Sequence, residues 1–369
     1  MSLTILSIAL AIVYVGMATM TVVNVVFLLR PPRKADLPAE PPLVSVIIPA
    51  RNEAENLQRL IPTVLSQRYP NFEVIVYDDG SEDETWSTAT SFGDRRLTVL
   101  RGAGPPPGWV GKVHALYKAT RIARGQLFLF LDADAAFRHP DAVSNLVRRF
   151  LDLPSPSLLS GLPRLRGGGQ LLVSFITFAL LALYPTPIAP RIRHRLLGIL
   201  NGQFWLIDRG LYLRYEPHQA HSNEVLEDVI IGRFFKGQGI TTRMQNLRHE
   251  LDVWMYRDLG DAWQGFRKNA YLVWGGTVVT FLLSMSLLGA VFLAGPILVP
   301  WTLGAIYFIK ITTDRFAGVP FWVSLLAPVS FVLAAILQFD SALGHWSGRV
   351  KWKGREVGRR PPLVPNTDH

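Results

Sequence analysis

Residues 128–134 combine an apolar run with two aspartates one residue apart, and this feature constrains the fold more than any other. The large apolar side chains of residues 128–131 predict a buried strand, with Asp132 and Asp134 at its carboxyl end. In an open α/β sheet this end of a strand borders the ligand-binding crevice. Because side chains alternate along an extended segment, both aspartates can approach one ligand or one divalent cation. A solvated turn after a strand is the competing interpretation, so the neighbouring sequence has to decide.

Two strands expected upstream also end in polar residues. Residues 44–49 form a short apolar run before a helical pattern, and residues 72–77 lead into Asp78 and Asp79. A helix is expected to open at Ser81, because acidic residues in the first turn and a serine cap favour a helix start. The carboxylates of Asp78 and Asp79 suit recognition of a nucleotide base and ribose, and capping of this helix is their structural alternative.

A third unit completes the pattern. Residues 97–100 form a short strand candidate, followed by a glycine- and proline-rich loop and a helix that carries Lys112. Strands that alternate with helices predict an α/β fold with a doubly wound, mostly parallel sheet. Polar residues at several strand ends then converge on one crevice, which is typical of a nucleotide-binding site.

These segments are similar to the successive motifs of family 2 glycosyltransferases. The matching segments are Pro49-Ala50-Arg51-Asn52-Glu53, Tyr77-Asp78-Asp79-Gly80-Ser81-Glu82-Asp83-Glu84-Thr85, Gly111-Lys112 and Asp132-Ala133-Asp134. Further along, Leu226-Glu227-Asp228-Val229 resembles the Glu-Asp motif, and Gln264-Gly265-Phe266-Arg267 resembles the QxxRW motif, with Lys268 in place of its tryptophan. The resemblance extends over roughly residues 41–275.

The resemblance implies a GT-A fold and inverting transfer from a nucleotide sugar, with a UDP-sugar favoured. The implied donor-binding residues are Pro49, Ala50, Arg51, Glu53, Asp78, Asp79, Lys112, Asp132, Ala133, Gln264 and Arg267. Asp134, with help from Asp132, is expected to hold Mg²⁺ or Mn²⁺, which prefer carboxylate oxygens and substrate phosphates. Lys112 and Arg267 are expected to neutralise the diphosphate of the leaving group.

The attacking hydroxyl of the acceptor needs a base within hydrogen-bond reach. Asp228 is the expected base, because it lies at the start of a predicted helix and corresponds to the acidic motif of the family. Glu227 beside it is expected to orient the base or its loop. The alternative is that this acidic pair only stabilises the helix through its dipole.

Composition places this domain at a membrane. The chain has 49% hydrophobic residues and a formal charge of +10, and residues 3–29 contain no charged side chain. That run is long enough to cross a bilayer, so residues 1–30 are expected to be a retained anchor rather than a secretory signal. Arg30, Arg33 and Lys34 follow at once, which predicts an external amino terminus and a cytoplasmic catalytic domain in an inner or plasma membrane.

The remaining boundaries follow from changes in composition. Residues 31–42 are read as a linker, residues 43–275 as the catalytic domain and residues 276–340 as two or three membrane segments. Residues 341–369 form a basic tail. Two spans would leave this tail inside, against anionic lipid, which we favour, and three would place it outside. The densest cations flank membrane segments, so a lipid surface explains the charge better than nucleic acid, and no nucleic-acid partner is expected.

An apolar segment near residues 171–195 lies within the catalytic region and is broken by prolines. It is short for a span, so it is expected to be an interface helix that presents a lipid acceptor, with a buried core helix as the alternative. The ensemble resembles lipid-directed members of the family that act on carotenoid, hopanoid or ceramide-type acceptors. Transfer to a polyprenyl phosphate is a second possibility, and a non-catalytic membrane scaffold of the same fold is a third.

Overall fold

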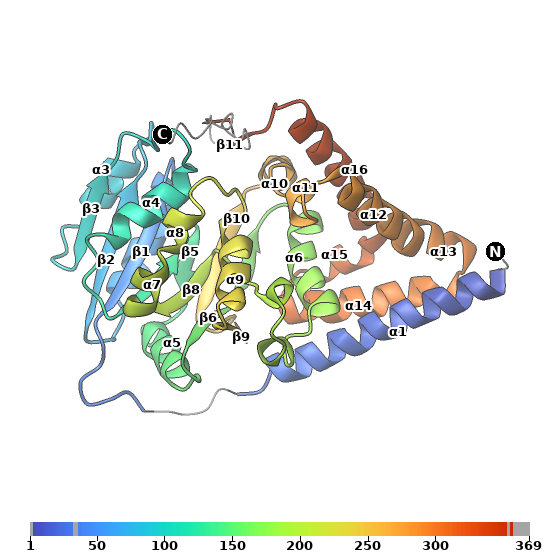
Figure 1. The fold of residues 1–369 in the computed structure, drawn as a ribbon, viewed down its shortest axis with the longest axis horizontal. Helices are drawn as coiled ribbons and strands as arrows, with labels where there is room; N and C mark the ends of the chain where they lie inside the picture. Colours follow the sequence, from blue (N-terminus) through green and yellow to red (C-terminus); the bar gives the residue numbers. More distant parts are fainter. Residues whose placement is uncertain (1–2, 32–35, 353–354, 357–369) are drawn as a thin grey trace, which may run out of the picture.

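The computed structural model describes residues 3–31, 36–352 and 355–356. It has an α/β part, on the left of Figure 1, and a layer of long apolar helices on the right. The amino-terminal helix α1 (Leu3–Leu28) runs along the lower edge of that helical layer and leads towards the α/β part. Residues 33 and 34 of the expected basic flank, and most of the expected basic tail, lie outside the described residues.

A seven-stranded sheet forms the centre of the α/β part, in the order β3-β2-β1-β4-β8-β6-β9. Its strands are β1 (Val44–Ala50), β2 (Phe72–Asp78), β3 (Leu97–Arg101), β4 (Leu127–Leu131), β6 (Ser157–Leu162), β8 (Phe204–Asp208) and β9 (Thr241–Asn246). The four strands from β3 to β4 are parallel, and β8 is antiparallel to both of its neighbours. The expected mostly parallel nucleotide-binding sheet is therefore confirmed. Every residue of β1, β2 and β4 is buried, as expected for strands covered on both faces.

A three-stranded sheet holds the segment that follows the two aspartates. β5 (Ala135–Phe137) is antiparallel to β10 (Leu251–Tyr256), which is parallel to β7 (Arg164–Gly167). The backbone N–H of Trp254 donates to the carbonyl of Asp134. The aspartate segment is thus fixed between two sheets.

Helices cover both faces of the large sheet. They include α2 (Ala54–Leu65), α3 (Thr85–Thr90), α4 (Gly111–Thr120), α5 (Ala142–Leu151), α7 (Arg209–Tyr215), α8 (Pro217–Ala220), α9 (Glu227–Gly237), α10 (Leu259–Arg267) and α11 (Ala270–Val273). The expected start at Ser81 is wrong, because α3 begins at Thr85. The N–H of Ser81 is bound by the Asp78 carboxylate and that of Glu82 by the Asn52 side chain, which holds this segment in a turn.

The helical layer contains three helices that are long and apolar enough to cross a membrane, among the described residues. They are Leu3–Leu28, Val278–Leu298 and Ala327–Trp346. The second comprises α12 (Val278–Leu288), a π-helical segment η3 (Gly289–Ala294) and α13 (Gly295–Leu298), and the third is α16. Between them lie α14 (Trp301–Ala317) and the short α15 (Phe321–Leu325). Figure 1 shows α13 and the amino terminus of α1 together at the far end of the layer.

Helix α6 (Gln170–Leu183) joins the two parts of the molecule. It contacts α1, α14 and α16 in the helical layer and α10 in the α/β part. Leu172, Val173 and Leu181 are fully buried, whereas Leu183 is 49% exposed. Two short 3₁₀ segments, η1 (Ala189–Arg191) and η2 (Arg195–Leu197), complete the stretch expected to lie at an interface. The described α6 is therefore largely enclosed by other helices rather than laid on an open surface.

Candidate active site

The carboxyl ends of β1, β2 and β4 open into one large cavity of about 2140 Å³. Most of the predicted site residues line it. They are Pro49, Ala50, Arg51, Glu53, Asp79, Lys112, Asp132, Ala133, Asp134, Glu227 and Asp228. The structure therefore brings together residues from five separate segments of the sequence, as the parallel sheet predicts. Their individual roles remain predictions.

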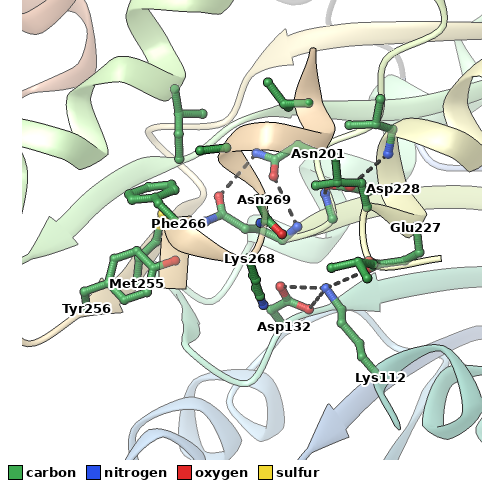
Figure 2. A pocket seen from close by; sticks show the side chains of 18 of the residues that line it. Lys112, Asp132, Asn201, Glu227, Asp228, Met255, Tyr256, Phe266, Lys268 and Asn269 are labelled. Carbon is green, nitrogen blue, oxygen red and sulfur yellow. Dashed lines mark hydrogen bonds and ion pairs between the residues drawn. The ribbon is translucent and has the colours of Figure 1, made fainter. Parts of the chain in front are cut away.

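Lys112 connects the aspartate strand to the acidic helix (Figure 2). Its Nζ lies 2.8 Å from Oδ1 of Asp132 and 2.9 Å from Oε1 of Glu227. Burial alone lowers the pKa of Lys112, but Asp132 and Glu227 outweigh burial and hold this pKa well above its usual value. Lys112 is thus a fixed cation between two carboxylates rather than a mobile surface lysine.

Asp228 lies in the first turn of α9 and is held by two backbone donors. Its Oδ2 accepts from the N–H of Gly202 at 2.9 Å, and its Oδ1 accepts from the N–H of Val229 at 2.8 Å. Burial, followed by the neighbouring charge of Glu227, raises the pKa of Asp228 to about 6. A carboxylate with this pKa is mostly ionised at neutral pH and is more basic than an ordinary aspartate, which suits a general base.

Gly202 approaches Asp228 so closely that a side chain would not fit. A Cβ on Gly202 would lie 2.9 Å from Oδ2 and 3.1 Å from Cβ of Asp228. The next residue, Gln203, accepts a hydrogen bond from the N–H of Asp132 through its carbonyl. The Asn201–Gly202–Gln203 turn therefore positions the expected base and one of the paired aspartates. Sequence reasoning missed this turn, although its Asn-Gly pair is a recognisable turn signal.

The paired aspartates fit a divalent cation by their chemistry. Asp132 and Asp134 both line the cavity, and burial raises the pKa of Asp132 despite the opposing charge of Lys112. Among the described residues no cluster of three or more acidic, histidine or cysteine side chains is arranged to hold a metal. A Mg²⁺-type ion needs only one or two carboxylates when substrate phosphates complete its coordination, so the aspartate pair is sufficient.

Two residues implied for the donor site have other positions. Asp78 is fully buried and is absent from the cavity lining, and its Oδ1 accepts from the N–H of Ser81 at 2.9 Å. Arg51 reaches across the same loop, with its Nη1 donating to the carbonyl oxygens of Asp79 at 3.0 Å and Gly80 at 3.1 Å. Asp78 thus shapes the loop, and Arg51 braces it at the cavity wall.

The QxxRW-like segment presents a different cation from the one expected. Gln264 and Arg267 do not line the cavity, whereas Lys268 does. Nε of Arg267 lies 3.0 Å from Oδ2 of Asp340 on α16, which also accepts from the Trp263 indole. Figure 2 shows Lys268 directed towards Asp132. Adjacent residues at the end of a helix point about 100° apart, so Arg267 and Lys268 do not face the same site.

The cavity also extends between the apolar helices. Its walls there include Val13, Met17, Phe175, Phe178, Leu287, Val291, Phe292, Phe331, Ala334 and Leu337. The rings of Phe292 and Phe331 are stacked with centroids 4.3 Å apart, and Phe178 meets Phe331 edge-on. Tyr256, near the carboxylates, and Asn269 are further lining residues that sequence reasoning missed. One cavity therefore combines a charged end with an apolar end.

Comparisons with known proteins agree with this arrangement. Residues 45–214 match the family described as Glycosyl transferase family 2. A 4,4'-diaponeurosporenoate glycosyltransferase of Staphylococcus aureus (strain bovine RF122 / ET3-1) is 28% identical over 202 residues, which are 53% of this chain and 52% of that protein. The chain spans about half the length of the curated relatives it matches.

A solved structure resembles nearly the whole chain. It is the mannosyltransferase PcManGT from Pyrobaculum calidifontis in complex with GDP-Man and Mn²⁺, at 21% identity and a TM-score of 0.56. The likeness covers 93% of this chain and 98% of that chain. At this identity the comparison shows the fold, and the expected GT-A fold is confirmed.

Proposed function

Given that residues 45–214 form a family 2 glycosyltransferase domain, we propose that the protein moves a sugar from a nucleotide sugar to a hydroxyl group of a membrane lipid, with inversion at the sugar carbon. One observation carries this proposal: the cavity that contains Asp132 and Asp228 continues between the apolar helices. A water-soluble donor and an apolar acceptor can therefore meet at the same carboxylates. The carotenoid-related acceptor in the name of the Staphylococcus aureus relative supports the same substrate class.

Asp228 is the proposed base. Its two backbone donors fix the carboxylate at the meeting point of the polar and apolar ends of the cavity. An acceptor hydroxyl beside it transfers its proton to Asp228 as the oxygen attacks the sugar carbon and the bond to the diphosphate breaks. Glu227 lies next to the base and pairs with Lys112, so it orients that lysine and keeps the pKa of Asp228 raised.

The departing nucleoside diphosphate needs positive charge, because electrostatic stabilisation of the leaving group dominates such transfers. Lys268 is the proposed contact with the diphosphate, and Lys112 contributes from the opposite wall. A divalent cation held by Asp134 and Asp132 would supply Lewis-acid stabilisation of the same group. The Mn²⁺ in the mannosyltransferase structure supports this cofactor class.

The helices suggest how the enzyme is oriented. Arg30 follows α1 directly, and positive residues next to a span favour the cytoplasmic side. We place the catalytic domain in the cytoplasm, where it has access to nucleotide sugars. In this orientation the apolar end of the cavity lies among the membrane helices, so the acceptor enters from the bilayer.

Mass spectrometry of lipid products tests the function. Purified protein is incubated with a panel of nucleotide sugars and a lipid extract of the producing cells, with Asp132→Asn as the inactive control. The expected result is a lipid whose mass increases by one sugar residue, formed with a matching donor and absent with the variant. Release of free sugar without any lipid product from every donor would contradict the proposal.

A further inference from the structure

Two arginines lie side by side where helix α14 ends. Arg164 begins β7, and Arg248 lies in the connection between β9 and β10. α14 is followed by Gly318, whose φ of 76° is left-handed. A Cβ on Gly318 would lie 3.0 Å from Nη2 of Arg248 and 3.5 Å from Nε of Arg164. Both guanidinium groups therefore converge on the same turn, from two different strand connections.

No acidic residue neutralises this pair among the residues that the structure describes. The acids close by are engaged elsewhere, since Glu250 pairs with Arg149 and Asp252 with two other arginines. Neither Arg164 nor Arg248 forms an ion pair, and the Nε of each is buried without a hydrogen-bond acceptor in that part of the chain. The guanidinium of Arg248 lies over the ring of Phe316, 5.3 Å from its centroid.

Such an arrangement is unfavourable unless an anion binds to it. Burial, followed by the charges of Arg164 and Arg138, lowers the pKa of Arg248, but arginine stays charged in proteins. Two half-buried, like charges with open donor positions match an oxyanion, because guanidinium forks bind phosphate oxygens in pairs.

The surroundings of the pair indicate a lipid headgroup. α1 and α14 run side by side, from the contact of Ser7 with Trp301 to the cluster that contains Leu28 and Phe316. The arginine pair thus lies at the helix end that precedes Arg30, which is the expected cytoplasmic boundary.

The segment that follows Gly318 is exposed and apolar. Phe321 is 55% exposed, Trp322 50% and Leu325 52%. Aromatic side chains next to arginines are typical of the region where lipid headgroups meet acyl chains. A free phosphate ion would have no use for these apolar neighbours.

We propose that Arg164 and Arg248 bind the phosphate group of an anionic membrane lipid, whose acyl chains lie against Phe321 and Trp322. The inference rests on the placement of α1 and α14 in a membrane and is independent of the transferase reaction. Bound lipid would hold the end of α14 against the three-stranded sheet.

Thermal unfolding of the full chain in nanodiscs tests the site. Wild-type protein is compared in phosphatidylcholine discs with and without phosphatidylglycerol. We expect the anionic lipid to raise the wild-type Tm by a few degrees, and the double variant Arg164→Gln/Arg248→Gln to lose most of this rise. Arg68→Gln/Arg95→Gln is the matched control, because it removes the same charge from exposed positions and should keep the rise.

Each remaining result decides the matter. Arg248→Lys keeps the charge but loses the fork, so it is expected to retain part of the rise and serves if the double variant does not fold. An equal Tm of wild type in both discs, or an equal loss of the rise in the control, would overturn the proposal. A similar Tm rise with millimolar inorganic phosphate in neutral detergent would assign the pair to a free anion and overturn the lipid source.

Discussion

Replacing Lys268 tests which cation of the α10 segment meets the donor diphosphate. Lys268 lines the cavity with Asp132, whereas Arg267 is paired with Asp340 on the far side of the helix end. We expect Lys268→Met to weaken nucleoside diphosphate binding while leaving the fold intact. Arg267→Met is the matched control, because it removes an adjacent positive charge from a side chain that does not line the cavity.

The size of the effect follows from the contact that is lost. A hydrogen bond to a charged group contributes about 1.5–3 kcal/mol, and 1.4 kcal/mol is a factor of ten, so the affinity for a nucleoside diphosphate should fall by about 10- to 100-fold. Arg267 and Asp340 are each about 30% exposed. Loss of such a partly solvated pair costs less than about 1 kcal/mol, so the control variant should change Tm slightly and affinity hardly at all.

Isothermal titration calorimetry can separate the phosphate contribution from the rest of the nucleotide. Each variant is titrated with the nucleoside diphosphate that wild type binds and with the corresponding nucleoside. Lys268→Met should reduce only the preference for the diphosphate, and Lys268→Arg should restore most of it. Loss of that preference in Arg267→Met, with Lys268→Met unchanged, would refute the reasoning and return the role to the arginine.

Three further outcomes follow from the site. Gly202→Ala should lower kcat by about 100-fold with little change in donor affinity, because a displacement of about 1 Å in a reacting group has that effect, and steady-state kinetics would contradict it if kcat were unchanged. Because Asp228 must be ionised to accept a proton, kcat/KM should fall as pH drops below about 6, whereas a flat profile down to pH 5 would exclude this base. Chelation and Asp134→Ala should each abolish transfer and weaken nucleoside diphosphate binding in calorimetry; full activity in excess chelator would exclude the metal.

The sequence was sufficient for the sheet and for most of the crevice, because both follow from local patterns. Buried strands followed by polar residues identify the ends of β1, β2 and β4, and the parallel arrangement then brings those residues together. The match over residues 45–214 confirms the resemblance to family 2 glycosyltransferases. The roles assigned to individual residues remain predictions.

The features that sequence reasoning missed depend on contacts between distant segments. Arg267 is drawn away from the cavity by Asp340, which is 73 positions later and has no motif of its own. Asn201, Gly202 and Gln203 act through backbone groups, so their residue types carry little chemical signal. The start of α3 was misplaced because side chains from the neighbouring loop, including Asn52, bind the N–H groups that would have opened the helix at Ser81.

Turnover of the Asp228→Asn variant with the identified lipid tests the central claim most directly. The substitution keeps the shape of the side chain and removes its ability to take a proton, so the account predicts a fall in kcat of about 10²- to 10⁴-fold, with donor affinity nearly unchanged. Turnover close to that of wild type would contradict a hydroxyl acceptor activated by Asp228. It would favour an acceptor that is already ionised, such as a polyprenyl phosphate.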